Sequence, residues 1–168
     1  MSYPPVRYQG DDGERGSATF RPASAPPDLA QPTGGGAAYL ASSALTGGDY
    51  GLFRWDMPAS PSGPGPHFHR TMSEAFFVLA GTVQLTDGAR TVEAGAGDFL
   101  YVPPGGVHGF RNESGEPASM LILFAPGAQR EAYFEALAEI GRTGRQLSAD
   151  EWTELYARHD QYMVPRVP

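Results

Sequence analysis

The sequence predicts an all-β barrel or sandwich followed by two α-helices. From residue 37 to about residue 126, short apolar runs alternate with glycine, proline and aspartate, a pattern typical of antiparallel strands joined by tight turns. Beyond residue 127, apolar residues recur at helical spacing instead. At 168 residues, the chain is long enough for one domain with a substantial core. We therefore divide it into an N-terminal arm (1–36), a barrel (37–126) and a C-terminal helical extension (127–168).

The arm is rich in proline, glycine, serine and alanine and has few large apolar side chains, so it cannot bury much surface by itself. Thr19-Phe20-Arg21 could add a short edge strand, and otherwise the arm is expected to be extended. The first residues have neither the charged start nor the apolar middle of a secretory signal. We expect a cytoplasmic protein without a membrane partner, because no run approaches the roughly 20 apolar residues of a membrane helix.

The barrel region is expected to consist of short strands. These lie near residues 38–43, 49–57, 66–70, 74–80, 82–87, 90–93, 98–102, 107–112 and 117–124. Gly47-Gly48 and Asp87-Gly88 are predicted to form tight hairpin turns.

Two amphipathic helices are predicted to follow. The first runs from Gln129 to Ile140, with Gly141 as its natural stop. The second begins at the capping box Ser148-Ala149-Asp150-Glu151 and runs to about His159, with a stripe formed by Trp152, Leu155 and Tyr156. We expect both helices to pack on the outside of the barrel or on a partner subunit.

Composition excludes several functions. A net charge of -7 argues against nucleic-acid binding, which needs a basic face. Every basic residue is arginine, so lysine Schiff bases and lysine general bases are excluded. The absence of cysteine excludes disulfides, thiolate-bound zinc and thiol nucleophiles.

Three of the four histidines form a recognisable pattern with one glutamate. His67 and His69 are two residues apart, so in a strand they point to the same face and can bind one ion together. Glu74 and His108 would complete a site of three histidines and one glutamate. Such ligands suit divalent first-row metals and leave coordination positions open. His159, the remaining histidine, is expected to be solvent-exposed.

The segments around these residues resemble the paired motifs of the cupin superfamily. In the first motif, the spacing from His67 through Glu74 to Gly81 matches, although Gly65 lies closer to His67 than is usual. In the second motif every position matches. Its residues are Gly97, Pro103, Gly105, His108 and Asn112. The resemblance implies a cupin double-stranded β-helix, or jelly-roll barrel.

The resemblance also implies one divalent transition metal per chain, which could be iron, manganese, nickel, cobalt, copper or zinc. With its helical tail, the chain looks like flavonol dioxygenases of the quercetinase type, in which the glutamate takes the proton of the substrate's enolic hydroxyl. Glu74 would then be ligand and general base, or alternatively a residue that only orients a histidine. Two other functions stay open: a non-oxidative cupin enzyme such as a polyketide cyclase or isomerase, and a non-catalytic metal- or small-molecule-binding cupin.

Strand alternation predicts an aromatic substrate pocket beside the metal. If Glu74 points inward, its strand neighbours two and four residues on do so too. The predicted lining consists of Phe53, Trp55, Met57, Phe76, Val78 and Phe110. This lining suits a flat, largely apolar small molecule. Arg54 and Arg70 flank this region and could hold an acidic group, although surface solvation fits each of them better.

A homodimer is also expected. An open barrel sheet exposes edge strands that must be covered, and the tail helices supply apolar surface beyond what one barrel needs.

Overall fold

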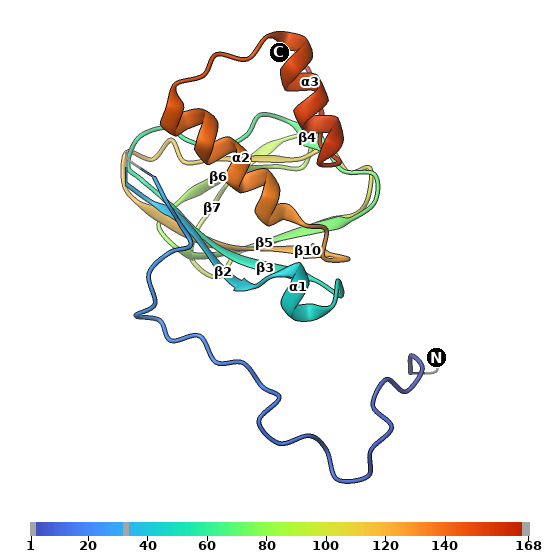
Figure 1. The fold of residues 1–168 in the computed structure, drawn as a ribbon. Coiled ribbons are helices and arrows are strands. Elements are labelled where there is room, and N and C mark those ends of the chain that lie inside the picture. The colour runs from blue at the N-terminus through green and yellow to red at the C-terminus, as the bar shows by residue number, and fades with distance from the viewer. Residues whose placement is uncertain (1–2, 32–33, 166–168) are drawn as a thin grey trace.

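The computed structural model describes residues 3–31 and 34–165, and most of its regular structure is antiparallel β-sheet (Figure 1). The largest sheet has six strands. In spatial order they are β1 (Leu29–Ala30), β2 (Gly36–Ala41), β3 (Gly51–Met57), β10 (Ala118–Ala125), β5 (Ser73–Ala80) and β8 (Phe99–Val102). The all-β prediction is confirmed.

Two smaller sheets complete the β structure. One contains β7 (Thr91–Ala94), β6 (Val83–Thr86) and β9 (Gly109–Arg111), and the other pairs β11 (Tyr162–Met163) with β4 (His67–Phe68). Consecutive strands β5 and β6 therefore belong to different sheets, as expected of a double-stranded β-helix. The turn between them needs Gly81, whose φ is 73° and where a Cβ would lie 2.5 Å from the carbonyl oxygen of Pro117.

The core follows from the alternation of side chains along the central strands. Every second residue of β10 is buried, from Ala118 to Phe124. On β5 the same alternation buries Phe76 and Val78 and leaves Phe77 exposed. Burial of these large apolar side chains is the main stabilising contribution to such a fold.

Several predicted strands are shorter than expected. The first ends at Ala41 because Ser43–Thr46 forms a short helix, α1, which the side chain of Ser42 caps. Gly47 ends this helix in a left-handed conformation. Strands β2 and β3 do pair antiparallel, but the tight hairpin turn predicted at Gly47-Gly48 was wrong, because the connection includes α1. The expected edge strand at Thr19-Phe20-Arg21 does not form, and the described part of the arm before β1 has no regular structure.

Both C-terminal helices are present. Helix α2 (Arg130–Thr143) continues past Gly141 and ends at Gly144, whose left-handed conformation terminates it, so the predicted stop was three residues early. Helix α3 (Ala149–Arg158) begins at the predicted capping box, in which Ser148 and Glu151 each bond the other's backbone N–H. No helix in the described part of the chain is long and apolar enough to cross a membrane.

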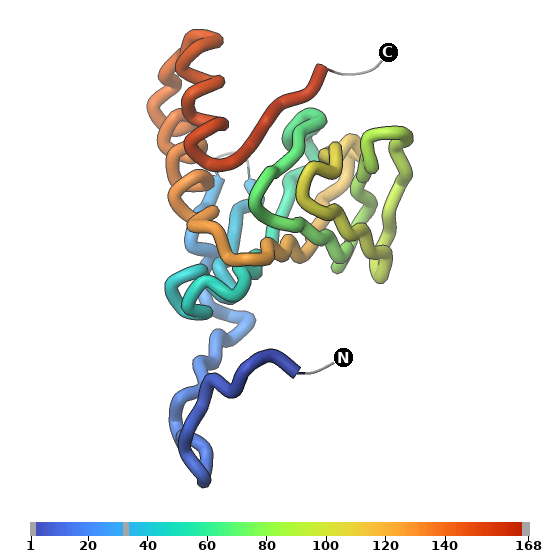
Figure 2. The backbone as a smooth tube through the Cα atoms, turned by 90° about the vertical axis from the view of Figure 1, so that its right-hand side faces the viewer, coloured from blue at the N-terminus to red at the C-terminus, as the bar shows by residue number. Residues whose placement is uncertain are grey.

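The position of the helices differs from the prediction that they pack on the outside of the barrel. Phe134 of α2 packs against three inward-facing side chains of the six-stranded sheet, those of Phe53, Trp55 and Phe124. Figures 1 and 2 show both helices over one face of this sheet, beside the smaller sheets. The helices therefore lie against the inner face of the six-stranded sheet and help to enclose the interior.

Candidate metal centre

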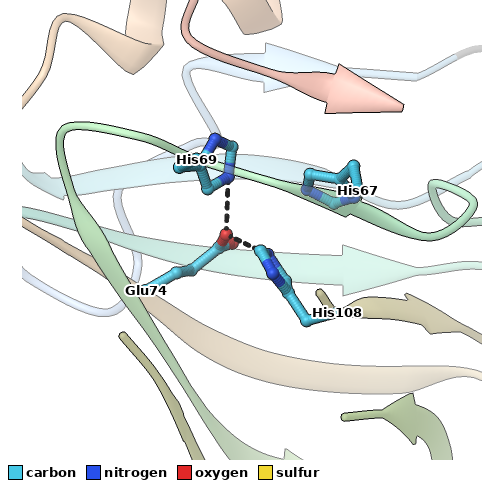
Figure 3. Close-up of side chains that lie close together, drawn as sticks. All are labelled: His67, His69, Glu74 and His108. Atoms are coloured by element: carbon cyan, nitrogen blue, oxygen red, sulfur yellow. Dashed lines mark hydrogen bonds and ion pairs between the residues drawn. The ribbon is translucent and has the colours of Figure 1, made fainter. Parts of the chain in front are cut away.

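The four residues of the predicted metal site lie together inside the barrel (Figure 3). His67 is on β4, His69 follows directly, Glu74 is on β5 and His108 immediately precedes β9. All four are at most 4% exposed. One candidate ligand atom from each residue lies within 4.8 Å of those of the other three, so one ion can contact all four.

Backbone pairing brings the two histidine segments together. His67 and His108 form an antiparallel bridge in which each backbone N–H donates to the other's carbonyl oxygen at 2.8 Å. The N–H of Gly105 donates to the carbonyl oxygen of His69 at 2.7 Å. Gly105 has a φ of 82°, which an L side chain rarely adopts, so this motif glycine permits the turn that places His108 opposite the other two histidines.

Each histidine ring is oriented by a backbone carbonyl at its Nδ1. The acceptors are Gly65 for His67 at 2.9 Å, Asp160 for His69 at 2.6 Å and Gly106 for His108 at 2.9 Å. Because a carbonyl oxygen only accepts, all three Nδ1 atoms carry the proton. This tautomer leaves Nε2 as the ligand atom of each ring, and Nε2 of His69 and of His108 points to Glu74 at the centre of the cluster.

The hydrogen bonds around Glu74 indicate that the cluster fits a cation. Its Oε2 atom lies 3.0 Å from Nε2 of His69 and 2.7 Å from Nε2 of His108. If both Nε2 atoms donated as well as both Nδ1 atoms, two buried rings would be positively charged beside a single carboxylate. A divalent ion in place of those two protons leaves neutral rings and satisfies the same carboxylate, as expected of a metal site.

The pKa values in the metal-free arrangement follow the same contacts. Burial, together with the charge of His108, lowers the pKa of His67 to about 3. Burial opposes ionisation of Glu74, yet the hydrogen bonds from His108 and His69 outweigh it and hold its pKa below the ordinary range. For His108, burial lowers the pKa, but the bond to Glu74 prevails and raises it. The site thus combines an ionised carboxylate with a neutral His67 at neutral pH.

The C-terminal segment after α3 holds the His67–His69 strand in place. The carboxylate of Asp160 accepts hydrogen bonds from the backbone N–H groups of Arg70 and Thr71 and from the Thr71 hydroxyl. Tyr162 stacks on Phe68 with ring centroids 5.2 Å apart, and the guanidinium of Arg70 lies over its ring. Strand β11 thus completes the support of β4.

Asn112, the last residue of the second motif, is fully buried but does not contact the cluster. Its Nδ2 donates to the carbonyl oxygens of Pro58 and Glu116, and its Oδ1 accepts from Ser114. It therefore fixes the loop that follows β9.

A cavity of about 380 Å³ reaches the cluster from the side covered by the helices. His67 and Glu74 are part of its wall. Of the predicted lining residues, Trp55, Met57 and Phe110 line it. Phe53, Phe76 and Val78 are instead fully buried in the core, and their assignment to the pocket is corrected. Their side chains point inward as predicted, but they lie where the barrel interior is filled by other core side chains.

The C-terminal segment supplies cavity residues that strand alternation did not predict. They are Arg130, Tyr133, Phe134, Leu137, Trp152, Tyr156, Gln161 and Met163. One sequence signal could have indicated these residues. The spacing of Arg130, Phe134 and Leu137 places them on one face of a helix, and a prediction that this face covers the barrel interior would have placed them in the cavity. Neither Arg54, which pairs with Asp56 at 3.0 Å, nor the exposed Arg70 lines the cavity. His159 is half-buried against Tyr133 and lies outside the cluster.

Comparison with known proteins agrees with this fold. Residues 53–124 match the family model described as the cupin domain. The uncharacterized protein SCO3923 of Streptomyces coelicolor is 33% identical over 76 residues, which cover 45% of this chain and 68% of that protein. A crystal structure of a predicted oxalate decarboxylase from Thermotoga maritima superimposes with a TM-score of 0.56 at 22% identity, covering 65% of this chain and 99% of that one. The chain belongs to the cupin superfamily.

One curated relative has a named activity. Quercetin 2,3-dioxygenase of Bacillus subtilis is 30% identical over 73 residues. The match covers 44% of this chain but only 21% of the dioxygenase, so this chain corresponds to about a fifth of that relative's length.

Proposed function

We propose that this protein is a metal-dependent dioxygenase acting on a flat aromatic or enolic substrate such as a flavonol, with Glu74 as ligand and general base. The observation that carries the proposal is the shared cavity wall. Glu74 and His67 border the same space as Trp55, Phe110 and the aromatic residues of the helices. A flat substrate in this cavity has its acidic hydroxyl within reach of the cluster.

The chain's own residues have separate tasks in this proposal. His67, His69 and His108 hold the ion through Nε2, and the carbonyls at their Nδ1 atoms keep the rings in that orientation. The bound ion would supply Lewis acidity and, if redox-active, a path for electrons between substrate and dioxygen. Glu74 accepts the proton of the substrate hydroxyl. In the metal-free arrangement, hydrogen bonds from two Nε2 atoms keep the pKa of Glu74 low, so the carboxylate is ionised and has lone pairs free to accept a proton.

The aromatic walls of the cavity would limit the access of water to the reacting atoms. Phe134 and Tyr133 of α2 are buried over the inner face of the sheet, and Trp152 of α3 borders the same space. A volume of about 380 Å³ is at the lower end of the range of roughly 300–1,000 Å³ for small-molecule sites. It suits one compact aromatic molecule. The likeness to quercetin 2,3-dioxygenase supports the same substrate class.

The test is dioxygen uptake. Protein purified without chelators is analysed for its metal, then prepared with iron, manganese, cobalt, nickel, copper or zinc and supplied with quercetin in an oxygen electrode. We expect uptake of one dioxygen per quercetin consumed with at least one redox-active metal. Conversion of a polyphenol or polyketide without oxygen uptake would instead favour the non-oxidative cupin enzymes. Binding without any conversion would favour a binding protein.

A further inference from the structure

Arg130 is an unusual arginine in this molecule. It is only 3% exposed, although its pKa is lowered by the burial that disfavours its charge. Other arginines of the described residues, such as Arg54 and Arg111, are half-buried or exposed and pair with a nearby carboxylate. Arg130 forms no ion pair with any carboxylate of residues 3–31 and 34–165. The carboxylates of Glu74 and Asp160 favour its charge only from beyond ion-pair distance. A buried positive charge without a hydrogen-bonded counter-ion is costly, so it calls for a functional explanation.

Its surroundings fix the guanidinium without neutralising it. Nη1 donates to the carbonyl oxygen of His159 at 2.7 Å and Nη2 donates to Oε1 of Gln161 at 3.1 Å. The rings of Tyr133 and Phe124 lie 4.3 and 5.0 Å from the guanidinium carbon. The buried Nε–H has no partner among the described residues. The group is therefore held rigidly with donor capacity left over.

Arg130 borders the same cavity as the metal cluster, and the carboxylates of that cavity are engaged elsewhere. Glu74 accepts from His69 and His108. Asp56, also on the cavity wall, pairs with Arg54 and accepts from the hydroxyl of Ser119 at 2.7 Å. The described residues thus provide no hydrogen-bonded anion for Arg130, whereas the space beside it is open to a ligand.

We propose that Arg130 is the anion-recognition residue of this cavity, and that the ligand is a flat organic acid. Its carboxylate, or ionised enol or phenol, accepts hydrogen bonds from the guanidinium while its apolar body lies among Trp55, Phe110 and Tyr133. This inference rests on the proposed function only in taking the cavity as the substrate site. It narrows the substrate class from flat aromatic molecules in general to those that carry a negative charge.

The test compares a matched acid and amide, cinnamate and cinnamamide, which have the same planar body. Binding to zinc-loaded protein is measured by calorimetry under anaerobic conditions, so that dioxygen chemistry plays no part. Trp55 and Trp152 are the chain's two tryptophans and both line the cavity, so quenching of intrinsic fluorescence verifies where the probe binds. We expect the wild type to bind cinnamate at least about tenfold more tightly, as for a hydrogen bond to a charged group.

Because a carboxylate can also reach the zinc, the decisive comparison is between variants with equal zinc content. Arg130→Met should abolish most of the preference for cinnamate and leave cinnamamide binding within about twofold, and Arg130→Lys should restore part of the preference. Arg142→Met removes an exposed arginine from the same helix and should retain the wild-type preference. Arg130→Gln replaces Arg130→Met if the latter does not fold.

Two results would overturn the proposal. One is a preference for cinnamate that persists in the neutral variants, which would make Arg130 a structural link between α2 and the segment after α3. The other is wild-type protein that binds both probes equally or neither at millimolar concentration, a result that needs no variant. Neither result bears on oxygen uptake with quercetin, so failure of this inference and failure of the dioxygenase proposal are distinguishable.

Discussion

His69 donates its Nδ1–H to the backbone carbonyl of Asp160, a residue 91 positions later, with 2.6 Å between the two atoms. This bond joins the candidate metal centre to the C-terminal segment. The side chain of Asp160 strengthens the link by accepting from the backbone of Arg70 and Thr71. Asp160 has a φ of 54°, unusual for a residue other than glycine, so its backbone conformation depends on these contacts.

Asp160→Gly should therefore weaken metal binding without straining the backbone. Glycine adopts a positive φ freely, but it lacks the carboxylate that anchors the segment to the His69 strand. We expect zinc affinity to fall about 10- to 100-fold, as is typical when a group that orients a ligand is lost. Chelator competition measures this. Asp87→Gly, which removes a carboxylate capping the β6–β7 turn, serves as control and should not change zinc affinity. Equal affinities in both variants would contradict the proposed support.

The ligand set predicts one divalent ion per chain. Alanine at His67, His69 or His108 should reduce bound metal sharply, because each ring contributes one Nε2 to a chelate. His159→Ala is the matched control, since this histidine lies outside the cluster and should leave metal content unchanged. Elemental analysis of protein purified at neutral pH measures both. Full metal content in His108→Ala would exclude the assigned site.

The cluster could be predicted from the sequence because it depends on the spacing of residues within short segments. His67, His69, Glu74 and His108 fall at fixed spacings between turn residues, and strand alternation determines which way they point. The same alternation predicted the inward direction of Phe76 and Val78 correctly. Alternation could not predict whether an inward side chain lies in the packed core or on the wall of the cavity. That difference depends on which side chains of other strands lie at the same level of the barrel.

The C-terminal contribution could not be predicted in the same way. The capping box and the helical stripes predict that α2 and α3 exist, but an amphipathic stripe does not specify which apolar surface it covers. The stripe of α2 covers the inner face of the sheet and brings Arg130 into the cavity, and the segment after α3 brings Asp160 to His69. These placements depend on long-range contacts that have no spacing rule.

The metal-free protein should lose stability as pH falls. Burial, with the charge of His108, lowers the pKa of His67 from 6.5 to about 3, so the unfolded chain binds more protons between these values. Stability therefore decreases through this window, by roughly 3–5 kcal/mol at most. The lowered pKa of Glu74 acts in the same direction below pH 4.5. The raised pKa of His108 has the opposite effect. It stabilises the folded protein at low pH, and this stabilisation is lost as pH rises through the pKa of His108 in the folded state.

Calorimetric melting of metal-free protein at several pH values measures this effect. His67→Asn removes the titrating group and should flatten the dependence between about pH 3 and 6.5. Wild-type and variant curves that run parallel over this range would show that His67 does not carry the effect.

A homodimer remains a proposal. The tail helices support it less than expected, because many of their apolar residues face the cavity. The outer face of β5 and β8 supports it better. Phe77, Leu79, Phe99 and Tyr101 are 40%, 39%, 63% and 57% exposed, and β8 is an edge strand of the described sheet. The double variant Phe99→Glu/Tyr101→Glu should give a monomeric mass in light scattering. Leu45→Glu changes a similarly exposed apolar residue on α1 and should not affect assembly. A monomeric wild type at micromolar concentration would exclude the dimer.

Glu74→Gln tests the chemistry of the proposed dioxygenase. A flavonol hydroxyl must lose its proton before the ring can pass electron density toward dioxygen, and Glu74 is the carboxylate of the cluster that borders the cavity. Glutamine keeps the size and one ligating oxygen but cannot accept the proton. We expect appreciable metal content and at least about a 100-fold loss of oxygen uptake with quercetin, the usual contribution of a general base.

Glu93→Gln, an exposed change on β7, should keep wild-type activity. A fully active Glu74→Gln protein would leave the dioxygenase in place but assign the base elsewhere, whereas metal loss in that variant would show that the carboxylate serves first as a ligand.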